Sequence, residues 1–168
     1  DLVNVLRAAC GRHDSRSVGL VTCGSRGIGR ACAVGLAEDG FDIAVVYAGS
    51  VDAARETCES CEAAGATARA YQCDVADPAA VNACVEAVLN DFSSIWALVN
   101  NAGITRDGLL MRMGDDVFDR VLDVNTQGTF KTKSAPTKPF MRQRGGCVPH
   151  MSPAVRLMGN TGTETSAA

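Results

Sequence analysis

The run VTCGSRGIG, from Val21 to Gly29, places glycines and small polar residues between an apolar run and a stretch with helical spacing. Its glycines are Gly24, Gly27 and Gly29. Glycine lets a backbone turn tightly and approach a pyrophosphate, and a helix N-terminus stabilises the phosphate charge. The run therefore predicts a phosphate-binding loop, with a strand-to-helix turn that holds no ligand as the alternative.

Other polar residues that could take part in chemistry stand at the ends of two later apolar runs. Asp74 follows the run TARAYQC, and Asn100–Gly103 closes the run IWALVNNAG. In sheets of parallel strands, ligands bind at the carboxyl ends of the strands. We therefore expect these residues and the glycine loop to lie at one edge of a sheet.

Strands and helices must position these residues, and the chain alternates between the two patterns. Short valine-rich runs predict buried strands, and apolar residues at helical spacing predict helices between them. The expected strands are 18–23, 41–47, 67–75 and 95–103, and the expected helices are 27–40, 51–64 and 78–92. Right-handed crossovers then give an α/β fold, a doubly wound parallel sheet of the Rossmann-like type.

The pattern weakens towards the C-terminal end, where we expect the sheet to be incomplete. A helix that begins near Asp115 is interrupted by Pro136 and Pro139, because proline lacks the amide hydrogen that a helix interior uses. Pro149 lies in GGCVPHMSPAV, where a fifth strand is due. A central strand needs the same donor, so Pro149 argues against a regular fifth strand.

Length and composition are those of a soluble globular protein with one domain. We expect residues 1–17 to be an N-terminal extension, with disorder as one option, and residues 18–168 to be a Rossmann-type dinucleotide-binding domain that lacks its last strands. The net charge of −3 argues against a nucleic-acid partner, and no apolar run reaches the roughly 20 residues that span a bilayer. A cytoplasmic location is expected, with an organellar targeting remnant as the weaker option.

The chain contains eight cysteines, which could indicate a metal site or disulfides. Cys58 and Cys61 form a C-x-x-C inside an expected helix, and no second such pair follows at zinc spacing. We therefore expect no metal site, and reduced cysteines that behave as small apolar residues.

Four motifs together resemble the short-chain dehydrogenase/reductase family. Thr22–Gly29 resembles its T-G-x-x-x-G-x-G loop, and the runs CDV at Cys73–Val75, NNAG at Asn100–Gly103 and DVN at Asp123–Asn125 match further family motifs at the proper separations. Within the family, NNAGITRDGLLMRM is similar to the 3-oxoacyl-(acyl-carrier-protein) reductases of fatty-acid synthesis. The resemblance covers roughly residues 18 to 168.

The resemblance implies a set of site residues, position by position. The implied cofactor-binding residues are Thr22, Cys23, Gly24, Ser25, Arg26, Gly27, Ile28, Gly29, Asp74, Val75, Asn101, Ala102 and Gly103. The loop from Cys23 to Gly29 would bind the cofactor phosphates. Asp74 and Val75 would contact the adenine ring, and Asn101–Gly103 would line the nicotinamide ribose. Asn125 would be catalytic, by holding a water in a proton relay. Arg144 would help to dock an acidic acyl carrier protein, with a small carbonyl compound as the other substrate option.

The choice of cofactor has a physical argument of its own. NAD-binding folds place Asp or Glu at the end of the second strand, where it bonds the ribose 2′-hydroxyl. No carboxylate occurs from Val45 to Ser50, and Arg26 is available for a 2′-phosphate. We therefore expect NADP(H).

Cys23 departs from the family loop, because it stands where the first glycine is expected. A side chain there is strained if the position needs a positive φ, and otherwise the thiol only crowds the adenosine side. Weakened cofactor binding is expected in either case.

The family's catalytic serine, tyrosine and lysine have no match here. Aligned on LMGN at 157–160, the serine position is Pro153, the tyrosine position is Ser166, and the lysine would be residue 170, beyond the sequence given. Family members are usually homotetramers, and the helix that joins them is not included either. The resemblance therefore implies an NADPH-dependent reductase lineage and a truncated, altered chain with little or no activity.

Two alternatives stay open at this stage. The chain could be a non-catalytic NADP-binding module, or a partner of a full-length reductase. The change in pattern near residue 131 also fits a frameshift or misassignment of the terminal sequence in a working enzyme.

Overall fold

A computed structural model describes residues 2–10, 17–105 and 114–151 of the chain. The strands are β1 (Val18–Thr22), β2 (Asp42–Tyr47), β3 (Ala68–Gln72) and β4 (Ala97–Val99). The helices are α1 (Leu2–Cys10), α2 (Gly27–Glu38), α3 (Val51–Ala63), α4 (Pro78–Phe92), α5 (Asp115–Leu122), α6 (Thr129–Ser134) and α7 (Thr137–Gln143), with a π-helical segment at Asp123–Gly128 between α5 and α6. The described helices include none long and apolar enough to cross a membrane.

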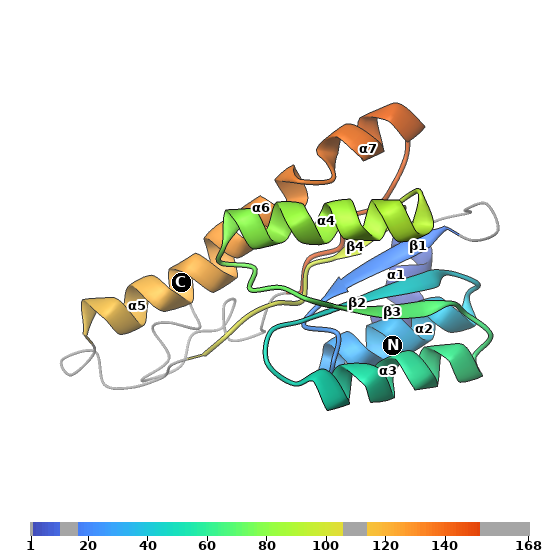
Figure 1. Ribbon diagram of the computed structural model, residues 1–168, viewed down its shortest axis with the longest axis horizontal. Coiled ribbons are helices and arrows are strands. Elements are labelled where there is room, and N and C mark those ends of the chain that lie inside the picture. Colours follow the sequence, from blue (N-terminus) through green and yellow to red (C-terminus); the bar gives the residue numbers. More distant parts are fainter. Residues whose placement is uncertain (1, 11–16, 106–113, 152–168) are drawn as a thin grey trace.

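The four strands form one parallel sheet in the order β3-β2-β1-β4 (Figure 1). Helices α2 and α3 cover one face, and α4 covers the other. All residues of β1 are buried, as expected for a central strand that packs on both faces. The predicted doubly wound, Rossmann-like α/β fold is confirmed.

Each face of the sheet has its own hydrophobic core. One core joins residues of α1, α2 and α3 to the sheet, and Leu36 and Phe41 are among its fully buried large side chains. The other core packs α4 on the sheet through Val81, Val85 and Val88, which stand at helical spacing within the expected helix 78–92. The strands position the polar residues, and the helices hold the strands in place.

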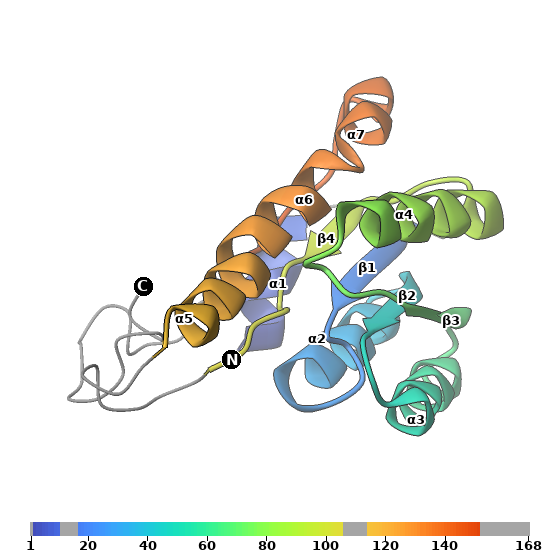
Figure 2. The ribbon, with the colours of Figure 1, turned by 60° about the vertical axis from the view of Figure 1, so that its left-hand side comes forward.

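The long helix after β4 is broken where the prolines predict. It runs from α5 through the π-helical segment to α6, and ends at Ser134. Pro136 is the residue before α7, and Pro139 lies in the first turn of α7, where an amide hydrogen is not needed for the helix. Figure 2 shows α5, α6 and α7 following one another along one side of the molecule.

Residues 147–151 run parallel to β4 and complete most of a fifth strand. Cys147 donates its N–H to the Trp96 carbonyl at 2.8 Å and accepts from Leu98 at 2.9 Å. Further along, the Pro149 carbonyl accepts from Asn100, and Met151 donates to the Asn100 carbonyl. In this register the nitrogen of Pro149 faces the Leu98 carbonyl, so the proline removes one ladder bond but does not displace the segment.

The N-terminus differs from the expected extension. Residues 2–10 form α1, which packs against α2 and buries Leu6 and Cys10 in the first core. Residues 2–10 are therefore helical, and the expectation for residues 1–17 as a whole stays a prediction. The segment is too short for its pattern of apolar residues to distinguish a docked helix from an unstructured tail.

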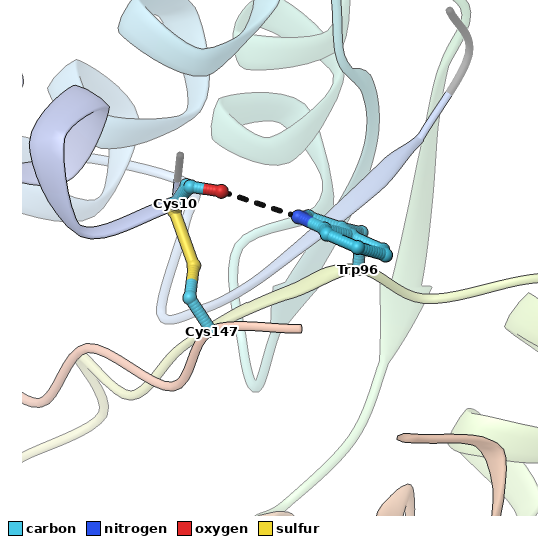
Figure 3. Close-up of a disulfide and its surroundings, with 3 residues drawn as sticks. All are labelled: Cys10, Trp96 and Cys147. Carbon is cyan, nitrogen blue, oxygen red and sulfur yellow. Dashed lines mark hydrogen bonds between the residues drawn. A yellow bond between two sulfur atoms is a disulfide. The ribbon is translucent and has the colours of Figure 1, made fainter. Parts of the chain in front are cut away.

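The expectation of eight reduced cysteines is wrong for one pair. Cys10 and Cys147 form a disulfide, 137 residues apart in sequence, with their Cα atoms 5.2 Å apart (Figure 3). The two cysteines lie in segments without a recognisable disulfide pattern, so only the fold brings them together. Among the free cysteines that the structure describes, Cys32, Cys58, Cys61, Cys73 and Cys84 are buried, as expected of small apolar residues.

Candidate functional site

The predicted phosphate loop lies between the end of β1 and the start of α2. Gly24 donates its N–H to the Val46 carbonyl at 3.0 Å, which ties the loop to the end of β2. Gly27 has a φ of +55°, in the left-handed region that favours glycine. A Cβ atom at Gly29 would overlap the Cys23 carbonyl oxygen and lie 2.6 Å from Asn101 Nδ2. The loop can therefore pack against the end of β4 only with glycine at position 29.

Cys23 adopts the strained conformation that the sequence raised as one option. Its φ is +49°, a value that residues with a Cβ rarely adopt. Burial raises the pKa of its thiol, although a hydrogen bond with the Gly103 backbone and the charge of Arg26 act in the opposite direction. The thiol is therefore in its neutral form near neutral pH.

The Thr22 hydroxyl connects the ends of β1 and β4. Its Oγ1 accepts hydrogen bonds from the N–H groups of Asn101 and Ala102, both at 2.9 Å, and donates to the Val99 carbonyl at 3.2 Å. The Asn101 side chain donates in return to the carbonyls of Thr22 and Cys23. Because Thr22 is 1% exposed, these bonds are shielded from water and fix the two segments relative to one another.

A cleft of about 440 Å³ opens where these segments meet. Its walls come from three carboxyl-end segments of the sheet, after β1, β2 and β4. The lining residues are Cys23, Ser25, Arg26, Ala48, Gly49, Ser50, Asn101 and Gly103. The structure thus brings part of the predicted set around one cavity and adds Ala48–Ser50, which the sequence marked only for the lack of a carboxylate.

Asp74 and Val75 follow β3 and are not among the residues that line this cleft. Asp74 accepts from the N–H of Ala76 at 2.9 Å and from Arg120 of α5 at 2.9 Å. These bonds hold the pKa of the Asp74 carboxyl below its usual value, so the group is ionised near neutral pH. The Val75 side chain is buried in the second core, which leaves its backbone as the part that a ligand could reach.

Asn125 lies in the π-helical segment and binds the chain after β4. Its Oδ1 accepts from the Ile104 N–H at 2.8 Å, and its Nδ2 donates to the Ile104 carbonyl at 3.0 Å. Asn125 thus belongs to a wider, π-helical turn within a longer helix. Turns of this kind are often found at functional sites. In this structure Asn125 therefore supports the Asn101–Gly103 segment.

A buried hydrogen bond between Thr132 and Asn100 was not predicted from the sequence. Thr132 of α6 donates its hydroxyl to Asn100 Oδ1 at 2.6 Å, and Asn100 is 2% exposed. The Nδ2 atom of Asn100 is a buried amide without a hydrogen-bond partner among the described residues. Nothing in the local sequence around Thr132 pairs it with a residue 32 positions earlier, because the contact is purely tertiary.

Other predicted site residues lie away from the cleft or outside the described residues. Arg144 is exposed at the end of α7, and the neighbouring Gln143 donates to the Ile95 carbonyl, before β4 begins. Pro153 and Ser166 fall outside the described residues. Within the described part of the chain, no three His, Cys, Asp or Glu side chains form a cluster that could hold a metal ion.

Comparison with known proteins identifies a family for this chain. The family model described as short chain dehydrogenase matches residues 17–165. The 3-oxoacyl-(acyl-carrier-protein) reductase FabG of Staphylococcus aureus (strain Mu50) is 46% identical over 143 residues, which are 85% of this chain and 58% of that protein. A 3-oxoacyl-(acyl-carrier-protein) reductase of Synechocystis is 40% identical over 151 residues, covering 90% of this chain and 61% of that protein.

A solved structure has the same fold as this chain. The crystal structure of NAD⁺-bound xylitol dehydrogenase superposes with a TM-score of 0.86 at 30% identity, covering 92% of this chain and 60% of that one. The chain thus spans about three fifths of the length of the proteins it matches.

Proposed function

Because this chain belongs to the short-chain dehydrogenase family, we propose that its cleft binds NADP(H). The observation that carries the proposal is the cleft itself, which joins the glycine loop, the end of β2 and the Asn101 segment around one volume of about 440 Å³. The residues present fit a dinucleotide, since Gly29 allows the close packing of loop and helix that a larger residue would prevent.

The end of β2 supports NADPH over NADH. Ala48, Gly49 and Ser50 line the cleft and carry no charge, whereas Arg26 lines it from the opposite segment. A 2′-phosphate would therefore meet a guanidinium and no carboxylate, and a charge-assisted pair of this kind is among the stronger hydrogen bonds. The Ser50 hydroxyl also caps α3, by accepting from the Ala53 N–H at 3.4 Å, so the helix begins at this wall of the cleft.

The reaction of the lineage would be reduction of a 3-oxoacyl thioester carried by acyl carrier protein, as the names of its relatives indicate. When bound, NADPH supplies the hydride for such a reduction. This chain's own residues would orient the nicotinamide end through Asn101 and Gly103, which Thr22 and Asn125 hold in position. Arg144, exposed at the end of α7, would contribute a positive charge towards an acidic carrier protein.

We further propose that the chain as given transfers little or no hydride. Pro153 stands where the family has a serine, and it has no hydroxyl to polarise a carbonyl. Ser166 stands where the family has the proton-donating tyrosine. Tyr71 cannot replace it, because its hydroxyl is bound to Asp91 at 2.6 Å, and burial raises its pKa above the ordinary tyrosine value. The chain would therefore serve as an NADP(H)-binding module.

Titration of the full chain with NADPH and with NADH, followed by nicotinamide fluorescence, tests the binding proposal. We expect saturable NADPH binding and at least tenfold weaker NADH binding. Arg26→Ala should remove most of that difference, because the 2′-phosphate loses its cation. Arg55→Ala is the matched control, since Arg55 is an exposed arginine on α3 that forms ion pairs with Asp52 and Glu59 of its own helix. Equal affinity for both nucleotides, or no saturation with either, would contradict the proposal.

An activity assay tests the proposed lack of hydride transfer separately. NADPH that binds but is not oxidised in the presence of a 3-oxoacyl thioester is the expected result. Oxidation above the rate without thioester would refute the inactivity, whatever the titration shows.

A further inference from the structure

Helix α1 covers part of the sheet that α2 and α3 leave open. Leu6 and Cys10 are 1% and 5% exposed and belong to the core that also contains Leu36, Ala97 and Val99. The helix therefore lies beside α2 over the β4 side of the sheet. Only nine residues long, it has too few turns to be stable alone in water, so its structure depends on what holds it to the sheet.

Two contacts connect the C-terminal end of α1 to residues that are distant in the sequence. Cys10 forms the disulfide with Cys147, and its carbonyl accepts a hydrogen bond from the indole Nε1 of Trp96 at 3.2 Å (Figure 3). Trp96 precedes β4, and Cys147 begins the segment that pairs with β4. The disulfide therefore joins α1 to the Cys147 segment, and the hydrogen bond from Trp96 joins the same end of α1 to the start of β4.

The segment that begins at Cys147 pairs with β4 as an interrupted strand. It lacks the ladder bond at Pro149, and its pairing with β4 consists of separate bridges at Cys147 and His150. Gly145 and Gly146, just before it, pack so closely on Trp96 and Phe140 that a Cβ atom at either position would meet a ring atom within 2.8 Å. The disulfide thus links an interrupted strand to a short helix.

We propose that Cys10 and Cys147 are a redox-operated clasp, which docks α1 and residues 145–151 on the β4 side of the sheet when oxidised and releases them when reduced. The oxidant would be a small disulfide such as oxidised glutathione. One cysteine thiolate attacks that disulfide and expels one glutathione thiol. The second cysteine then attacks the mixed disulfide, forming the Cys10–Cys147 bond and expelling the other thiol. Reduction by a dithiol reverses both steps, and electrons and protons balance in each direction.

The two cysteines of the clasp differ from one another in their access to solvent. Cys147 is partly exposed, whereas Cys10 is 5% exposed. Among the free cysteines, Cys58, Cys61 and Cys84 are buried and Cys23 is partly exposed, and burial raises the pKa of the Cys23 thiol. Burial raises the pKa of Cys61 to about 12, which keeps that thiol protonated and unreactive. Because Cys147 is the more exposed residue of the pair, thiol–disulfide exchange would start there.

The experiment uses the full chain equilibrated with oxidised glutathione or with dithiothreitol. Peptide mapping without reduction should find Cys10 linked to Cys147 only in the oxidised sample. Trp96 is the only tryptophan in the chain, so its emission reports on the contact with Cys10. We expect a red-shifted emission on reduction, and an acceleration of amide exchange in residues 2–10 and 145–151 that is at least tenfold larger than the acceleration in β1 and β2.

Variants separate the clasp from general effects of thiol reagents. In the Cys10→Ser, Cys147→Ser double variant, emission and exchange should match the reduced protein in both buffers. Cys58→Ser, which removes a free cysteine on α3, should respond as the natural chain does. The proposal is overturned if the linked peptide never forms, or if oxidation leaves emission and exchange in residues 2–10 unchanged. Because the natural chain is compared in two buffers, a variant that fails to fold does not affect the decision.

Discussion

The most unusual residue of the cleft is Cys23, a side chain in a backbone conformation that suits glycine. Its φ of +49° costs roughly 1–2 kcal/mol relative to glycine, because the Cβ crowds the neighbouring carbonyl. The conformation persists because Gly24 is tied to Val46 and the Cys23 carbonyl accepts from Asn101. The surrounding bonds thus hold the loop in a shape that its own sequence disfavours.

Replacing Cys23 with glycine should therefore stabilise the protein. We expect Cys23→Gly to raise the free energy of unfolding by about 1 kcal/mol, which urea denaturation measures, and to tighten NADPH binding several-fold. Cys23→Ala is the control, since it removes the thiol but keeps the Cβ. If alanine gives the same gain as glycine, the thiol and not the backbone is the source of the strain.

At the scale of elements, the fifth strand shows what one proline changes. The segment 147–151 keeps parallel register with β4 because Cys147, Asn100 and Met151 all make their ladder bonds. Pro149 removes a single donor between them, so bridges remain where a continuous strand could form.

Restoring the donor should strengthen this edge of the sheet. In Pro149→Val the new N–H faces the Leu98 carbonyl, and valine suits a strand. We expect a gain of about 1 kcal/mol in urea denaturation and slow exchange of the new amide hydrogen. Pro149→Ala supplies the same donor with less β propensity and should keep part of the gain. A loss of stability in both variants would show that the segment depends on the fixed φ of proline instead.

At the scale of the whole molecule, the disulfide connects the first described helix to the last described segment. The two cysteines are 137 residues apart, so the link removes a large share of the freedom of the unfolded chain. In the chain-entropy description a loop of this length corresponds to about 4–5 kcal/mol of stability.

Reduction should therefore lower the urea midpoint of the natural chain markedly, and the loss should be absent from the Cys10→Ser, Cys147→Ser double variant. The measurement is a pair of urea curves, with and without dithiothreitol. Equal midpoints for the natural chain in the two conditions would contradict the expectation.

The fold class and the position of the glycine loop could be predicted from the sequence. Valine-rich runs, helical spacing and the glycines of 24–29 are local properties, and a parallel sheet follows from their alternation. The prolines at 136 and 139 likewise act within their own helix, which is why the break after Ser134 was predictable.

The contacts between residues far apart in the sequence follow only from the tertiary structure. The docking of α1, the Cys10–Cys147 disulfide, the Thr132–Asn100 hydrogen bond and the Arg120–Asp74 ion pair each join residues that no local pattern connects. Their partners are set by how the helices pack on the sheet. The backbone of Cys23 belongs to the same group, because its φ follows from bonds to β2 and β4 and not from its neighbours in sequence.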